Sequence, residues 1–63
     1  MRQLLTTEQV ADSLGLRRNT LEKWRLLGEG PHFIKAGRQV RYDSEDVDQW
    51  LSSRRVQSTS AAL

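Results

Sequence analysis

The chain has 63 residues, a formal net charge of +2 and no cysteine, so we expect one small domain without disulfides or thiolate metal ligands. Its single histidine, His32, cannot form a zinc site alone. No apolar stretch is long enough for a signal peptide or a membrane span, so we expect a cytoplasmic protein without a membrane partner.

The charges are distributed unevenly along the chain. Seven basic residues and two acids lie between Arg17 and Arg41, whereas four acids and no base lie between Asp43 and Asp48. Clustered positive charge of this kind is typical of a surface that binds nucleic acid. Two solvated faces that happen to differ in sign give the same pattern, so charge alone leaves both interpretations open.

The segment LLTTEQVADSLG, residues 4–15, predicts a short capped helix. Thr6 is a good N-cap, and Gln9 three residues later completes a capping box. Apolar residues recur at helical spacing from Val10 onwards, which gives the helix one apolar face. Gly15 can take the left-handed conformation that ends a helix.

The segment RRNTLEKWRLLGEG, residues 17–30, restarts the helical pattern after a short turn. We expect Leu21, Trp24 and Leu27 to face the core. The glycines and the proline that follow end this helix. Two short helices joined by a glycine-containing turn predict a helix-turn-helix, although an ordinary αα-hairpin is the commoner arrangement among all proteins.

The start of this second helix has two candidate N-caps. The length of the turn favours Arg17, but arginine is a poor N-cap and its charge opposes the helix dipole. Asn19 with Glu22 would make a better cap and capping box. In both cases Arg17 and Arg18 lie at the positive end of a helix, an arrangement that becomes favourable beside a phosphate.

The segment HFIKAGRQVRY predicts a β-hairpin. We expect strands at about Phe33–Lys35 and Gln39–Tyr42, around a turn at Ala36–Arg38 in which Gly37 is free to take a positive φ. Alternate residues of the second strand, beginning with Val40, would face the core. The basic residues of the hairpin, with no acid among them, are Lys35, Arg38 and Arg41.

The segment DSEDVDQWLSS predicts a third helix. Asp43 is its N-cap, and the acidic residues in its first turn are favoured there by the helix dipole. Val47, Trp50 and Leu51 form its apolar face. Residues 54–63 are polar, small and aperiodic, and they predict a disordered tail.

The order helix, turn, helix, hairpin, helix predicts a mainly α fold with a small β-hairpin, namely a winged helix-turn-helix over residues 1–53. An isolated hairpin is marginal in water, so this one must pack on the helices through its apolar residues. Its charged tip would then project beside the second helix. The two elements have the widths that fit a major groove and the neighbouring backbone or minor groove. We therefore expect binding of double-stranded DNA.

Four motifs, LLTTEQVADSLGL, NTLEKWRLLGEGP, KAGRQVRY and SEDVDQWL, together resemble the small excisionase and AlpA-type regulators, relatives of the MerR DNA-binding domain. The resemblance covers about Leu4 to Leu51. It implies that the second helix enters the major groove and that the wing contacts the adjacent minor groove or backbone. Members often act as recombination directionality factors, which bind side by side, bend an attachment site and help an integrase to excise a mobile element. Others regulate transcription.

The resemblance implies two sets of DNA-binding residues. Those of the recognition helix are Arg17, Arg18, Asn19, Thr20 and Lys23. Those of the wing are Lys35, Arg38 and Arg41. The chain departs from the family pattern at Arg17, where relatives usually carry a serine-like N-cap. It also lacks the long dimerising helix and effector-binding part of full MerR regulators, so we expect no small-molecule effector.

The resemblance also implies the partners. They are double-stranded DNA, the integrase or recombinase of the same mobile element and, head to tail on DNA, further copies of the chain. Association with the nucleoid would follow from DNA binding. An AlpA-type transcriptional regulator is the first alternative to the excisionase-like role.

Several residues also have more ordinary interpretations. Trp24 and Trp50 could stack on single-stranded bases, but their helical spacing favours core packing. Asn19 can read adenine or cap its helix. Arg25 can contact a phosphate or pair with a neighbouring glutamate. The acids that follow Tyr42 fit helix capping better than metal binding.

The sequence contains no plausible nucleophile–base pair, metal cluster or glycine-rich phosphate loop. We therefore expect no enzymatic activity, no metal and no cofactor. A protein-interaction module without DNA binding is the second alternative. A salt titration with duplex DNA distinguishes it, because binding through several Lys and Arg contacts weakens steeply with salt.

Overall fold

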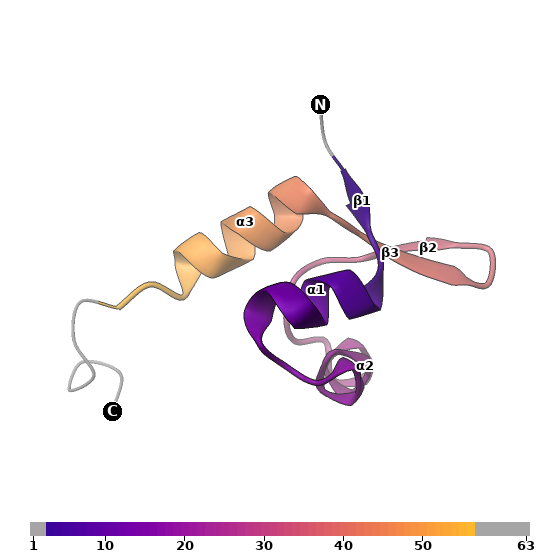
Figure 1. Ribbon diagram of the computed structural model, residues 1–63, viewed down its shortest axis with the longest axis horizontal. Helices are drawn as coiled ribbons and strands as arrows, with labels where there is room; N and C mark the ends of the chain where they lie inside the picture. Colours follow the sequence, from indigo (N-terminus) through magenta and orange to yellow (C-terminus); the bar gives the residue numbers. More distant parts are fainter. Residues whose placement is uncertain (1–2, 57–63) are drawn as a thin grey trace.

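The computed structural model describes residues 3–56, which form three helices and a three-stranded antiparallel sheet (Figure 1). The elements in chain order are β1 (Leu4–Leu5), α1 (Thr7–Leu14), α2 (Arg18–Leu27), β2 (Ile34–Ala36), β3 (Gln39–Asp43) and α3 (Ser44–Ser53). The hairpin β2–β3 extends away from the helices, and α3 lies on the opposite side of the molecule from its tip (Figure 1). This is the winged helix-turn-helix that the sequence predicts, with the hairpin as the wing.

Helix α1 begins and ends where its sequence predicts. The Thr6 hydroxyl accepts a hydrogen bond from the Gln9 N–H (3.1 Å), and the Gln9 side chain accepts one from the Thr6 N–H (2.9 Å), which completes the capping box. Gly15 has a φ of 68°, and its N–H donates to the carbonyls of Ala11 and Asp12. This left-handed residue ends α1 and turns the chain toward α2.

The sheet has the strand order β1-β3-β2, and the sequence does not predict its first strand. In β1, Leu4 pairs with Asp43 and Leu5 pairs with Tyr42. Two residues are too few to show a strand period, and their partner lies nearly forty positions away. The Ser44 N–H also donates to the Gln3 carbonyl (2.9 Å). These bonds hold the start of α1 beside β3, and with it the wing.

The wing has a two-residue turn, Gly37–Arg38, because Ala36 pairs with Gln39. A positive φ at Gly37 (65°) but not at the next residue matches a type II′ turn, which suits the twist of the flanking strands. The first strand of the hairpin, Ile34–Ala36, begins and ends one residue later than the expected Phe33–Lys35. The second strand runs one residue further than expected, to the N-cap of α3.

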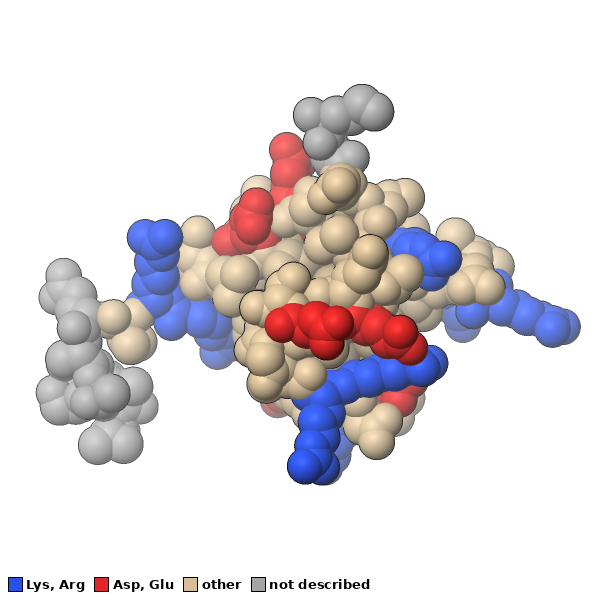
Figure 2. Space-filling model, viewed as in Figure 1, with Lys and Arg blue, Asp and Glu red and all other residues tan. Residues whose placement is uncertain are grey.

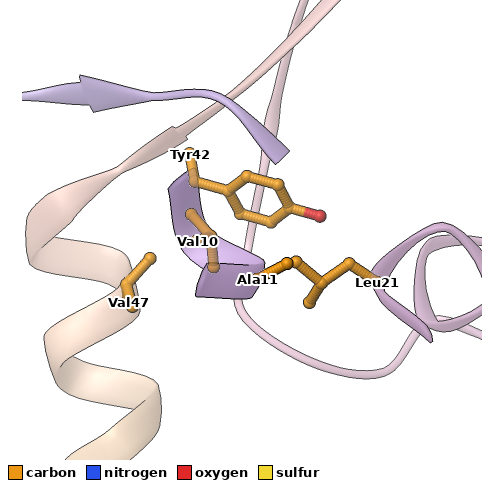
Figure 3. Close-up of a cluster of buried hydrophobic side chains, with 5 residues drawn as sticks. All are labelled: Val10, Ala11, Leu21, Tyr42 and Val47. Atoms are coloured by element: carbon orange, nitrogen blue, oxygen red, sulfur yellow. The ribbon is translucent and has the colours of Figure 1, made fainter. Parts of the chain in front are cut away.

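The core is built from all three helices and the central strand (Figure 3). Its buried hydrophobic residues are Val10, Ala11, Leu21, Tyr42 and Val47. Figure 3 shows the Tyr42 ring lying across Val10, with its hydroxyl pointing away from α3. Half-buried apolar residues of β1, α1, α2 and β3 pack around this cluster.

Two residues that were expected to face the core lie at the surface. Leu27 is 61% exposed because it lies six residues after the buried Leu21, which is about 120° around the helix. Leu51 is 41% exposed, so the apolar face of α3 is narrower than expected. The N-cap of α3 is as expected: the buried Asp43 carboxylate accepts from the Glu45 N–H (2.9 Å).

Trp24 and Trp50 join α2 to α3 at the edge of the core. Both are half-buried, and their ring centroids are 5.4 Å apart, as core packing requires. The chain passes close to this pair at Gly30, whose φ is 79°. A Cβ at this position would lie 2.6 Å from Cε3 of Trp24. Glycine is therefore required here for two reasons, its backbone conformation and the space beside the ring.

Helix α3 ends at Ser53. Of the tail predicted over residues 54–63, residues 57–63 lie outside the part that the structure describes. None of the helices within residues 3–56 is long and apolar enough to cross a membrane.

Replacement of Gly30 by alanine should reduce the free energy of unfolding by about 2–5 kcal/mol. Left-handed backbone costs about 1–2 kcal/mol for an L-residue, and overpacking against Trp24 adds about 1–3 kcal/mol. Gly28→Ala is the matched control, because Gly28 has a φ of 72° and an added Cβ would meet no atom within 4 Å. Urea unfolding followed by circular dichroism measures both. Equal losses in the two variants would show that the contact with Trp24 is unimportant.

Candidate nucleic-acid interface

Helix α2 begins at Arg18, with Arg17 as its N-cap. The Arg17 side chain makes no capping hydrogen bond, and the first turn of α2 contains no acidic residue. Arg17 is therefore the N-cap of α2, and the alternative prediction that Asn19 caps this helix is wrong. The positive end of α2 thus carries two arginines and no carboxylate from its own first turn, which is unfavourable unless an anion approaches.

One face of α2 is turned to solvent. Asn19 and Lys23 are exposed on it, one helical turn apart, and Thr20 beside them is half-buried. Within residues 3–56, no carboxylate lies within ion-pair distance of Lys23. A free ammonium group and a free carboxamide on neighbouring turns are suited to hydrogen bonding with base edges.

Arg18 is exposed, but its charge is already paired. One guanidinium nitrogen lies 3.1 Å from a carboxylate oxygen of Glu8 on α1, and another lies 3.3 Å from Glu22 one turn further along α2. Exposed ion pairs contribute only about 0–1 kcal/mol each. They nevertheless place two carboxylates beside the basic end of α2, and a phosphate would have to compete with them for Arg18.

Arg25 has a structural position that sequence reasoning missed. Its guanidinium donates to the Tyr42 hydroxyl (2.9 Å) and the Thr7 hydroxyl (3.2 Å), and it lies 5.7 Å from the centroid of the Phe33 ring. The expected pairing of Arg25 with a neighbouring glutamate is not what residues 3–56 show. No sequence signal indicates these contacts, because the three partners come from different elements.

The wing carries its three basic residues in different settings. Arg38 is exposed at the tip, in the turn, and Lys35 is exposed on β2 opposite Val40. Arg41 is half-buried: its guanidinium turns back and donates to the Val40 carbonyl (2.8 Å) and more weakly to Gln39 (3.4 Å). Two of the three cations are thus free to meet a partner, and the third is held against the strand.

A groove of about 460 Å³ separates the wing from the two helices of the helix-turn-helix. It is lined by the first turn of α1, by one side of α2 and by the outer part of the wing. Its charged lining residues are Glu8, Arg18, Glu22, Arg25, Arg38 and Arg41. Figure 2 shows basic side chains projecting at the position of α2 and at the tip of the wing, with acidic side chains directly beside the former.

The family model described as Helix-turn-helix domain matches residues 4–55, which is most of the chain and includes every helix and strand of the described residues. The chain belongs to the helix-turn-helix domain family. This family includes small DNA-binding proteins of the excisionase and AlpA type. A comparison with curated proteins gave no significant match. The helix-turn-helix domain indicates DNA binding.

The geometry of this helix-turn-helix domain separates the predicted site residues into two groups. Exposed and without an ion pair among residues 3–56 are Arg17, Asn19, Lys23, Lys35 and Arg38. Engaged within the domain or half-buried are Arg18, Thr20 and Arg41. The described residues contain no group of three or more His, Cys, Asp or Glu side chains that could hold a metal ion.

Glu8→Gln should increase affinity for duplex DNA. The substitution removes a carboxylate from the groove and frees Arg18 from one of its two partners, so the slope of log affinity against log salt should become steeper by about one. Asp48→Asn on α3 is the control with the same change of net charge, because Asp48 does not line the groove. Fluorescence anisotropy at several salt concentrations measures both. An equal change in affinity and in salt slope for the two variants would show that Arg18 does not contact the DNA.

Proposed function

We propose that this helix-turn-helix domain binds double-stranded DNA with α2 in the major groove and with the wing against the adjacent backbone or minor groove. The observation that carries the proposal is that Arg18 of α2 and Arg38 of the wing are both exposed and line one groove between the two elements, while Lys23 is exposed further around α2. A major groove about 12 Å wide admits one helix, and the two-stranded wing is narrow enough to follow the backbone beside it.

Sequence readout would come from α2. Lys23 can donate to O6 and N7 of guanine, and Asn19 can donate to N7 and accept from N6 of adenine. The support for Asn19 is that its side chain is exposed and not used as a helix cap. The arginines at the start of α2 would contact phosphates, where their charge complements the helix dipole.

The wing would position the domain without reading sequence. Arg38 is exposed in the turn, and Lys35 is exposed on the flanking strand. Phosphate contacts of this type fix register on the duplex and add a strong dependence on salt. Arg41 would contribute less than the other two, because the Val40 carbonyl already holds its guanidinium.

We further propose an excisionase-like role, in which several copies bind in line on an attachment site, bend it and help an integrase to excise a mobile element. One support is the separation of charge within the domain. The acidic residues at the start of α3 lie on the opposite side of the fold from the basic tip of the wing, so neighbouring copies can approach head to tail (Figures 1 and 2). The proposed biochemical role is binding without catalysis.

Lys23→Ala, which would remove a base contact, and Arg38→Ala, which would remove a phosphate contact, should weaken DNA binding in different ways. Loss of a base contact should cost about 1–3 kcal/mol on a duplex selected from a random library and little on an unrelated duplex. Loss of a phosphate contact should weaken binding to both duplexes equally and reduce the salt slope by about one. Anisotropy titrations of both variants on both duplexes measure this. Binding that ignores duplex DNA and salt would contradict the proposed function and favour a protein-interaction module.

Binding to tandem copies of the selected site should be stepwise and cooperative and should bend the duplex. A single small domain makes few contacts, so one site alone is expected to bind weakly. Gel shifts on one, two and three sites measure cooperativity, and circularly permuted probes measure bending. Asp48→Lys should reduce cooperativity but leave the first complex unchanged. A single complex on straight DNA would contradict the excisionase-like role and leave an AlpA-type transcriptional regulator.

A further inference from the structure

Leu26 is the most exposed large apolar side chain within residues 3–56, with 88% of its surface accessible. It is the penultimate residue of α2 and lies outside the core cluster and the shell of residues packed around it. A single exposed leucine is common on protein surfaces, so exposure alone assigns it no role. The position of Leu26 on α2, however, indicates a role.

Leu26 continues the exposed face of the recognition helix. It lies three residues after Lys23 and seven after Asn19, so all three side chains project from the same side of α2. The buried Leu21 is five residues earlier, which places it about 140° away around the helix. Leu27 is also exposed (61%) and lies about 40° from Lys23, but it lies about 80° around the helix from Asn19, whereas Leu26 lies within about 20° of Asn19.

The row of exposed side chains formed by Asn19, Lys23 and Leu26 has the length of a short stretch of base pairs. Seven residues of α-helix span about 10.5 Å, which corresponds to about three steps of 3.4 Å in one DNA strand. A major groove that accepts Asn19 at one end of the row therefore meets Leu26 at the other. The base edges there are polar with one exception, the C5-methyl group of thymine, which is the natural contact for an aliphatic side chain.

We propose that Leu26 is a specificity-determining residue that contacts the methyl group of a thymine about three base pairs from the base that Asn19 meets. The inference rests on the proposed function, since it requires α2 to lie in the major groove. It adds an apolar contact to a recognition surface that sequence reasoning described by its polar and basic residues alone. Removing one methyl group from an apolar contact lowers affinity by about fourfold.

The experiment replaces each thymine of the selected duplex, one at a time, by deoxyuridine, which lacks only that methyl group. Wild-type protein should lose affinity about two- to fourfold at one position. Leu26→Ala should bind the thymine duplex at least fourfold more weakly and should no longer distinguish thymine from deoxyuridine at that position. Leu27→Ala is the matched control and should still bind the thymine duplex more tightly than the deoxyuridine duplex. Thermal unfolding should be unchanged in both variants, because both side chains are exposed.

Three results would overturn the proposal and leave DNA binding intact. They are a wild-type protein that is insensitive to deoxyuridine at every position, a Leu26→Ala variant as sensitive as the wild type, and a Leu26→Ala variant with undiminished affinity. Failure to select any duplex would instead overturn the proposed function itself.

Discussion

One guanidinium group joins the wing to both helices of the helix-turn-helix. Arg25 of α2 bonds the Thr7 hydroxyl of α1 and the Tyr42 hydroxyl of β3, and it lies over the Phe33 ring just before β2. Tyr42 is 1% exposed, so its hydroxyl needs a hydrogen-bond partner inside the fold, and a charged donor supplies a strong one. The groove between the wing and α2, and with it the spacing of the two basic elements, depends on this arrangement.

The charges around that groove divide the cations into those that build the fold and those that are free to bind. Arg25 and Arg41 are held by hydroxyl and carbonyl oxygens, and Arg18 is held by two carboxylates. Lys23 and Arg38 have no such partner among the described residues. Arg38 lines the groove, and Lys23 is exposed on α2 outside the groove lining. A cluster of seven basic residues in the sequence is therefore a smaller set of available charges in the folded domain. The affinity for DNA and its salt dependence should be set by these available charges.

The parts of the fold that the sequence predicts are those decided by near neighbours. The capping box of Thr6 and Gln9 and the left-handed Gly15 lie within single turns, and local chemistry decides them. The pairing of β1 with β3 and the contacts of Arg25 join segments far apart in the chain, and no local pattern contains them. The apolar character of Leu27 predicts burial, but its angle around α2 places it at the surface. At the candidate site, the local pattern predicts which element carries each residue but not how the residues pair, since Glu8 reaches Arg18 from another helix.

The central claim is that α2 and the wing meet the same duplex as one rigid surface. Titration of the isotopically labelled protein with a selected duplex, followed by amide chemical shifts, tests it most directly. We expect the amides of α2 and of the wing to shift together, in proportion to the DNA added, while the indole signals of Trp24 and Trp50 stay in place. Shifts confined to α3, or shifts in α2 with none in the wing, would contradict the account.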